Sequence, residues 1–353
     1  MFMRLYPPGI FKGLSSIAIL SILIVIGSRK LIYFDAALIP YLIATLFAVF
    51  GSVYRYSVWL SRPPTRTLWK RSLNLFFSKH FFSNFFFIIR AFFENMFLQK
   101  FIGKRSHYRW IMHFLLAWGC VLGFAVTFPL VFGWLHFAHP LGDAYMYQLY
   151  VFGFPMMIFD PYGIIGFLFF NSLNFCSVMI IVGTVMAFSR RLFHPGEITT
   201  QTFNHDILPL LILFSVAISG LFLTFSTHYL AGQHYRILST VHCWTVVAFL
   251  VYLPFGKFFH IFQRSAQMGA ELYIHEKEQG TLAVCPKTGE KFTSQVQKDD
   301  VKSILRELGF KFETEGEKFS VQDLSPQARR QLMMTTQHKR LKGEFDITRK
   351  KVD

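Results

Sequence analysis

The sequence has few charged residues and a large apolar share. Charged side chains make up 16% of the 353 residues, whereas 53% are hydrophobic and 18% are aromatic. The mean hydropathy is positive, at +0.38. A soluble protein of this length cannot bury so much apolar surface, so the excess must face lipid. The composition therefore excludes an ordinary soluble protein.

Cysteine is scarce, and the four cysteines lie far apart at Cys120, Cys176, Cys243 and Cys285. Zinc sites, iron–sulfur clusters and c-type haem attachment use closely spaced cysteines such as C-x-x-C and C-x-x-C-H. The chain contains neither pattern. Any redox centre in it must therefore use other ligands.

Lysine and arginine are absent from residues 135–161 and crowded into residues 61–109. The second segment has ten basic residues against one acid, Glu94. The positive-inside rule then places 61–109 in the cytoplasm and 135–161 outside. The net charge of +16 is mostly charge at the membrane surface, and it gives no reason to expect a nucleic-acid partner.

Six apolar runs are long enough to cross a membrane, which takes about 20 helical residues. Because their number is even, alternating crossings place both termini in the cytoplasm. The runs cover roughly residues 10–27, 36–60, 108–134, 162–188, 206–227 and 237–262.

The first run begins close to Met1, where a signal peptide is the alternative to a retained helix. Basic residues precede its apolar part, as in a signal peptide, but Gly27-Ser28-Arg29-Lys30 is a poor match to a small-x-small cleavage site. We expect an uncleaved helix in an N-terminal region, 1–35.

Two further segments differ from the spans in composition. Residues 72–104 mix phenylalanines with Lys79 and Arg90, which predicts an amphipathic segment lying among lipid headgroups or packed on a partner subunit. Residues 265–353 are polar and form a soluble region. There we expect a helix near 301–308 ended by Gly309, then Phe310 and Phe312 in an alternating pattern, and a polar tail over the last thirty or so residues. This region suggests a docking surface.

Polar groups inside a membrane are costly, so they are candidates for function. Histidine is the side chain that ligates haem iron through a neutral ring nitrogen. His242 and His260 are 18 residues apart in the run 237–262. On a continuous helix this spacing is five turns, so both rings would leave one face about 27 Å apart. Pro254 between them would bend that helix.

His113 and His260 are predicted to lie at similar depth. His113 follows Arg109 by four residues, and His260 precedes Arg264 by four residues on a helix of opposite direction. This arrangement predicts an axial pair around one haem near the cytoplasmic surface, with Arg109, Arg264 or Lys257 close to its propionates. The alternative is that both histidines are interfacial and satisfied by water or lipid phosphate.

Several motifs between residues 36 and 265 resemble the gamma subunit of respiratory nitrate reductase and the related membrane subunits of heterodisulfide reductase and dissimilatory sulfite reductase complexes. The motifs are Arg109-Trp110-Ile-Met-His113, Arg190-Arg191-Leu192-Phe193-His-Pro195 followed by Asp206-Ile207-Leu208, Ser219-Gly220-Leu221 with Phe225-Ser226, and His242…Leu253-Pro254-Phe255…His260-Ile261-Phe262.

The resemblance implies an all-α integral membrane protein of the prokaryotic cytoplasmic membrane. Its bundle, 36–264, would hold b-type haem in five helices, with one extra N-terminal transmembrane helix and a small cytoplasmic C-terminal region. In this family, quinol (menaquinol or ubiquinol) is oxidised toward the outer side, and electrons pass to a cytoplasmic iron–sulfur subunit. The chain would then be an electron-transfer subunit of an oxidoreductase. His113 and His260 match the ligands of the inner haem, and His242 matches one ligand of the outer haem.

One position departs from the family pattern. The nitrate-reductase branch has a histidine ten residues after the one that matches His113, and here that position is Gly123. An outer haem would need another partner for His242, and His228 is the first candidate, ahead of His136 and His139. A quinone pocket is expected near Thr227–His234 or Tyr145–Asp160.

Two other classes of protein share parts of this pattern. A transporter is also a helical bundle, but it usually shows repeated halves and matched helix breaks, which this sequence lacks. A haem-free anchor for a redox complex would share the basic loop and the soluble region. It would not require His113, His242 and His260 to occupy these positions.

Overall fold

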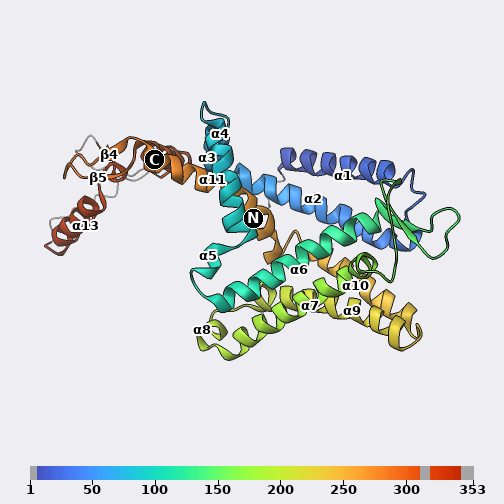
Figure 1. Ribbon diagram of the computed structural model, residues 1–353. Helices are drawn as coiled ribbons and strands as arrows, with labels where there is room; N and C mark the ends of the chain where they lie inside the picture. The colour runs from blue at the N-terminus through green and yellow to red at the C-terminus, as the bar shows by residue number, and fades with distance from the viewer. Residues whose placement is uncertain (1–5, 311–318, 343–353) are drawn as a thin grey trace. The chain divides into compact units, whose positions relative to one another are not determined.

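The computed structural model describes residues 6–310 and 319–342, and these residues are mostly helical (Figure 1). Within them, six helices are long and apolar enough to cross a membrane, which confirms the predicted number of spans and supports an integral membrane protein. They are α1 (Pro7–Gly27), α2 (Ile39–Ser61) with the preceding turn η1 (Ala36–Leu38), α6 (His107–Val131), α7 (Ile164–Phe193), α9 (Leu208–Tyr229) with the preceding η3 (Phe203–Ile207), and α10 (Tyr235–Tyr252).

The chain forms two compact units. The first unit runs to Trp59 and continues over Phe92–Ser265, and the second unit combines Leu60–Ala91 with the chain from Ala266 onward. In the sequence, the basic loop ends at residue 109 and the polar C-terminal region begins at residue 265. The structure joins part of that loop to the C-terminal region in one unit.

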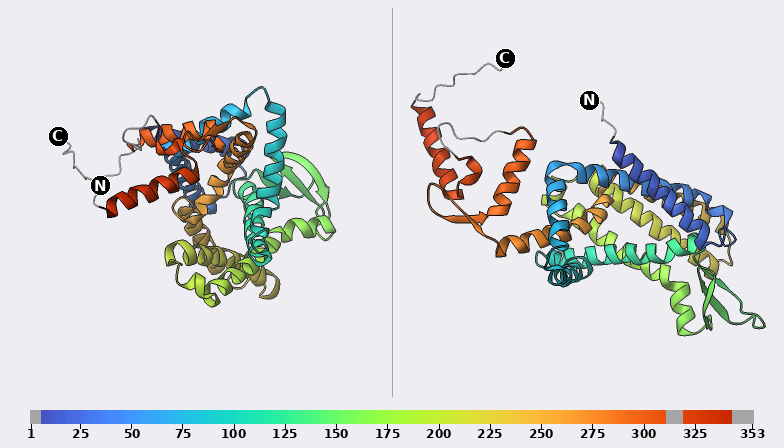
Figure 2. Two further views of the ribbon diagram at one scale, coloured as in Figure 1. Left: turned by 90° about the vertical axis from the view of Figure 1, so that its left-hand side faces the viewer. Right: turned by 90° about the horizontal axis from the view of Figure 1, so that it is seen from above.

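Small residues let the membrane helices of the first unit approach closely. Helix α7 packs between α6 and α9 (Figures 1 and 2). A Cβ atom on Gly119 of α6 would lie 2.8 Å from Ile180, and one on Gly183 of α7 would lie 2.8 Å from Leu116. Thr224 of α9 donates a hydrogen bond to Asn174 of α7 at 2.7 Å. Close backbones and hydrogen bonds between helices are typical of membrane bundles, where lipid provides no hydrophobic driving force.

The connection between α6 and α7 contains a three-stranded antiparallel sheet. Its strands are β1 (Leu135–Ala138), β2 (Tyr147–Val151) and β3 (Phe154–Phe159). Phe152 and Gly153, with φ of 50° and 75°, form the two-residue turn between β2 and β3. Two left-handed residues are what a tight hairpin of this kind requires. The expectation of an all-α fold is therefore wrong for this connection.

The sixth span is not one continuous helix from 237 to 262. Helix α10 ends at Tyr252, a turn η4 covers Lys257–Phe259, and a new helix α11 (His260–Gln279) begins at His260. Pro254 has no N–H to donate, and it disfavours helical conformation in the residue before it. The prediction that His242 and His260 share one helix face is therefore wrong.

Arg55 of α2 satisfies carbonyl groups at this break. Its Nη1 atom donates to the Pro254 carbonyl at 2.5 Å and lies 3.5 Å from the Gly256 carbonyl. Its guanidinium carbon lies 4.2 Å from the centre of the Phe259 ring. A break at membrane depth is tolerated where protein groups satisfy the exposed backbone.

In its described residues, the second unit contains five helices, counting the part of α11 that it includes, with two short strands and one turn of 3-10 helix. Besides the part of α11 after Ser265, the elements are α3 (Pro63–Phe76), α4 (Phe81–Ala91), β4 (Leu282–Val284), β5 (Lys291–Ser294), α12 (Gln295–Glu307), η5 (Val321–Asp323) and α13 (Pro326–Leu341). Cys285, Leu324 and Ala328 form a small buried core.

Four sequence expectations concern residues 72–104 and the region from 265 onward. The segment 72–104 is not one helix, because it is divided among α3, α4, the π-helix η2 (Phe92–Phe97) and α5 (Lys100–Gly103). The helix expected near 301–308 lies almost wholly within α12, and Gly309 follows it at φ 80°. Phe312 lies outside the described residues. The expected polar tail instead contains α13, whose first turn is capped by the Ser325 hydroxyl.

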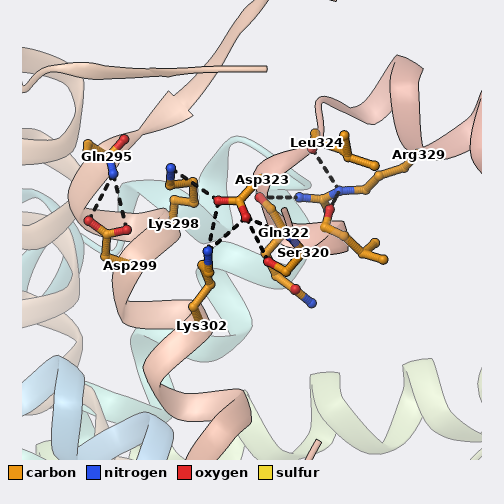
Figure 3. A network of polar contacts seen from close by, with 10 residues as sticks. Gln295, Lys298, Asp299, Lys302, Ser320, Gln322, Asp323, Leu324 and Arg329 are labelled. Carbon is orange, nitrogen blue, oxygen red and sulfur yellow. Dashed lines mark hydrogen bonds and ion pairs between the residues drawn. The ribbon is translucent and has the colours of Figure 1, made fainter. Parts of the chain in front are cut away.

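Ion pairs join the elements of the second unit. Lys302 and Lys298 approach the Asp323 carboxylate at 2.8 and 3.3 Å, and the Ser320 N–H donates to it at 2.9 Å (Figure 3). Burial alone would raise the pKa of Asp323, but these partners hold it well below its usual range. Arg71 of α3 also pairs with Asp300 of α12 at 2.9 Å.

Candidate functional site

The structure brings together the rings of His113 and His260. His113 lies in the second turn of α6, and His260 is the first residue of α11. Their ring centroids are 6.4 Å apart with an angle of 68° between the planes. Both side chains are partly buried. The break at Pro254 contributes to this pairing, because α11 starts from its own turn and does not continue the axis of α10.

Both rings are oriented by an acceptor at Nδ1. His113 Nδ1 lies 2.8 Å from Gln99 Oε1, and His260 Nδ1 lies 2.6 Å from the Lys257 carbonyl oxygen. An amide or backbone oxygen only accepts, so each ring donates from Nδ1 and keeps its lone pair on Nε2. None of the residues that the structure describes makes a hydrogen bond to either Nε2. Each ring therefore presents an unprotonated nitrogen that is able to bind a metal.

The three cations predicted near this site have different surroundings. Arg264 lies one turn after His260, with its guanidinium carbon 4.6 Å from the centre of the Phe101 ring. Lys257 donates to Asp206 at 2.8 Å and is engaged in an ion pair. Arg109 is exposed in the first turn of α6. Arg264 shares α11 with His260, and Arg109 shares α6 with His113.

His242 lies on α10 beside α9. Its Nδ1 atom is 2.9 Å from the Ser219 hydroxyl, which itself donates to the Ser215 carbonyl at 2.6 Å. The same hydroxyl also lies 3.1 Å from the Val216 carbonyl oxygen and 3.1 Å from Thr245 Oγ1, so the contact holds the ring in place without fixing which of its nitrogens carries the proton. A Cβ atom on Gly220 would lie 3.4 Å from His242 Cε1, an ordinary van der Waals distance, so the ring packs beside α9 at this glycine.

The structure does not bring His228 to His242. Ser219, which contacts His242, precedes His228 by nine residues on α9, or about 13.5 Å along the axis. His228 is exposed in the last turn of that helix.

The other two histidines considered for this partnership lie in and after β1. His136 is stacked between Tyr33 and Tyr150, with centroid distances of 3.8 and 4.9 Å. Burial, together with the positive charge of Arg29, lowers the pKa of His136, so this ring is neutral. His139 Nδ1 lies 3.0 Å from the Met146 carbonyl oxygen. Both rings have structural contacts of their own.

The segments predicted to hold quinone are ordered by their own contacts. The Ser226 hydroxyl donates to the Gln233 carbonyl at 2.5 Å and closes the turn that contains Thr227–His234. Residues Tyr145–Asp160 include strands β2 and β3.

Gln99 is the residue of this site that the sequence does not reveal. Its side chain is 5% exposed, and its backbone has a φ of 54°. A glutamine in an apolar stretch, Phe97-Leu98-Gln99, is the only available signal. That signal does not indicate which group the side chain contacts.

The histidine pair suits an iron that already has other ligands. Within 6–310 and 319–342, no group of three or more His, Cys, Asp or Glu side chains is arranged to hold a metal ion. A bare ion needs three or four protein ligands, whereas a porphyrin supplies four and leaves two axial positions for the protein. Two imidazoles whose centroids are 6.4 Å apart could therefore serve as a pair of ligands to such an iron, but they are too few for a bare ion.

Comparisons of the chain with protein-family models, with curated proteins and with solved structures find no match. The fold and composition define a mostly helical protein with six potential membrane spans. The resemblance to the nitrate reductase gamma subunit remains a prediction from sequence motifs.

Proposed function

We propose that this chain is a membrane-embedded b-type cytochrome subunit that passes electrons between the quinone pool and a cytoplasmic iron–sulfur partner. The distance between the rings of His113 and His260 carries the proposal. Two metal–nitrogen bonds of about 2 Å, and about 1 Å from each nitrogen to its ring centre, separate the centroids of an axial pair by about 6 Å. The observed separation is 6.4 Å.

The hydrogen bonds at Nδ1 also support the proposal. Ligating histidines commonly donate their second N–H to a carbonyl or carboxylate, which fixes the tautomer and the ring orientation. Gln99 and the Lys257 carbonyl would do so here. Bound haem would supply a one-electron redox couple. Arg264 would stabilise a propionate, while Lys257 is already paired with Asp206.

We propose one haem at this pair. His242 contacts Ser219, and the geometry around Ser219 does not support His228 as its partner. A second haem would need an axial ligand other than His228.

The orientation and partner follow from charge. The basic segment 61–109 favours a cytoplasmic location for that side, with both termini there and the three-stranded sheet outside. The polar residues of the second unit would then be available to an iron–sulfur subunit in the prokaryotic cytoplasm. Menaquinone or ubiquinone would be the membrane substrate.

The test is haem content with paired histidine variants. Purified wild type should contain b-type haem at about one per chain, measured by the pyridine haemochrome and by a reduced-minus-oxidised spectrum. His113→Ala and His260→Ala should each abolish that haem. His228→Ala is the matched control, because His228 is exposed and not near the pair, and it should retain the haem.

The same measurement distinguishes the alternatives. Wild-type protein without haem in intact membranes would contradict the proposal and favour a haem-free anchor. A bis-histidine spectrum that survives loss of His260 would overturn this pairing.

A further inference from the structure

Gln99 has a backbone conformation that disfavours its residue type. Its φ and ψ are 54° and 36°, in the left-handed region, and its side chain is 5% exposed. Side chains other than glycine, asparagine and aspartate rarely adopt this conformation, which costs free energy and persists only where the surroundings impose it. Such residues are concentrated at functional sites.

Two tryptophans of α6 impose this conformation. Trp110 Nε1 donates to the Leu98 carbonyl at 2.8 Å, and Trp118 Nε1 donates to the Phe97 carbonyl at 3.1 Å. These tryptophans lie on either side of His113 in the sequence. Segment 97–99, which begins at the last residue of the π-helix η2, is thus attached to the helix that carries His113. With its backbone fixed, Gln99 places Oε1 2.8 Å from His113 Nδ1.

We infer that Gln99 is a positioning residue that sets the reduction potential of the haem iron bound by His113. The inference rests on the proposed haem. A hydrogen bond accepted from Nδ1 makes the imidazole a stronger electron donor to iron and stabilises the oxidised state. A neutral amide does this less than a carboxylate would. The amide of Gln99 therefore holds the potential at an intermediate value.

Two substitutions separate this role from a structural one. Gln99→Glu replaces the amide oxygen with a carboxylate of the same length and should lower the midpoint potential. At a fixed electrode potential the ratio of reduced to oxidised haem should fall roughly tenfold, which is about 59 mV for one electron. Gln99→Gly removes the acceptor but suits the left-handed backbone, so it should raise the potential while the protein remains folded.

The measurement is a potentiometric titration of the purified full-length protein, followed by haem absorbance. Asn95→Asp is the matched control, because it adds the same charge in the same chain segment four residues from Gln99. Its shift should be smaller than that of Gln99→Glu. Midpoint potentials that shift in opposite directions in Gln99→Glu and Gln99→Gly would support the inference. Loss of packing alone would shift the potentials of both variants in the same direction.

The outcomes separate this inference from the proposed function. Haem with an unchanged potential in Gln99→Gly, or an equal shift in Asn95→Asp and Gln99→Glu, would overturn the role of Gln99 alone. Wild-type protein without haem would overturn the proposed function, and this inference with it. If Gln99→Glu fails to accumulate, the sign of the shift in Gln99→Gly decides.

Discussion

Arg55 shows how one charged residue can lie within a membrane span. Its guanidinium bonds backbone carbonyl groups at the end of α10 and lies over Phe259, next to His260. Charged groups in membrane helices usually face the interior of the bundle and have such partners. At this scale, the turn that precedes His260 is contacted by a residue that belongs to neither histidine helix.

Replacing Arg55 should weaken the fold and the site together. Arg55→Leu leaves the carbonyl groups of Pro254 and Gly256 without this donor, at a cost of about 1–3 kcal/mol. Arg55→Lys should lose less stability and less haem, because an ammonium group reaches one carbonyl but lacks the planar, forked donors of the guanidinium. Thermal unfolding in detergent and haem content measure both effects. Arg62→Leu, at an exposed position, is the control, and equal losses in Arg62→Leu and Arg55→Leu would contradict this role.

The two faces of α4 differ at the scale of one helix. Asn84 donates to the Leu75 carbonyl at 2.8 Å, and Phe87 stacks on His275 with centroids 4.4 Å apart, so one face packs within the second unit. Phe82, Phe86 and Ile89 follow helical spacing on the other face and are 75%, 65% and 47% exposed. The sequence allows lipid headgroups or a partner subunit for this face.

We expect the exposed face of α4 to contact lipid. Arg90, near its C-terminal end, and Lys79, just before the helix, supply positive charge of the kind that attracts anionic headgroups. A spin label at Phe86→Cys, in a background without the native cysteines, should be more accessible to oxygen than to a polar nickel complex in liposomes. A label at Lys79→Cys should show the reverse. Equal protection of Phe86→Cys from both reagents would indicate a protein partner.

Elements of different kinds were predictable to different degrees. The six spans follow from length and hydropathy because the bilayer sets both. Pro254 marked the place of a bend, but its local pattern could not show that the helix ends there and restarts at His260. Helix α13 has little apolar periodicity, and its signal is the Ser325–Pro326 cap. The contact of Gln99 with His113 depends on a left-handed backbone that no composition reveals.

At the scale of the whole molecule, the distribution of charge predicts the orientation. Ten basic residues in 61–109, against no lysine or arginine in 135–161, oppose translocation of the first segment. With six spans, the two chain ends lie on the same side as the basic segment.

Asp143→Cys, in the connection with the three-stranded sheet, should react with a membrane-impermeant maleimide in intact spheroplasts. Arg340→Cys, on the exposed surface of α13, should react only after permeabilisation. Labelling of both positions in intact spheroplasts would require an even number of crossings between them. That result would contradict this topology, in which the three spans α7, α9 and α10 separate residues 143 and 340 and α11 remains outside the bilayer. Labelling of Asp143→Cys alone would therefore also indicate that the chain does not cross again after the break at Pro254, which is the arrangement that leaves His260 near the same surface as the two chain ends.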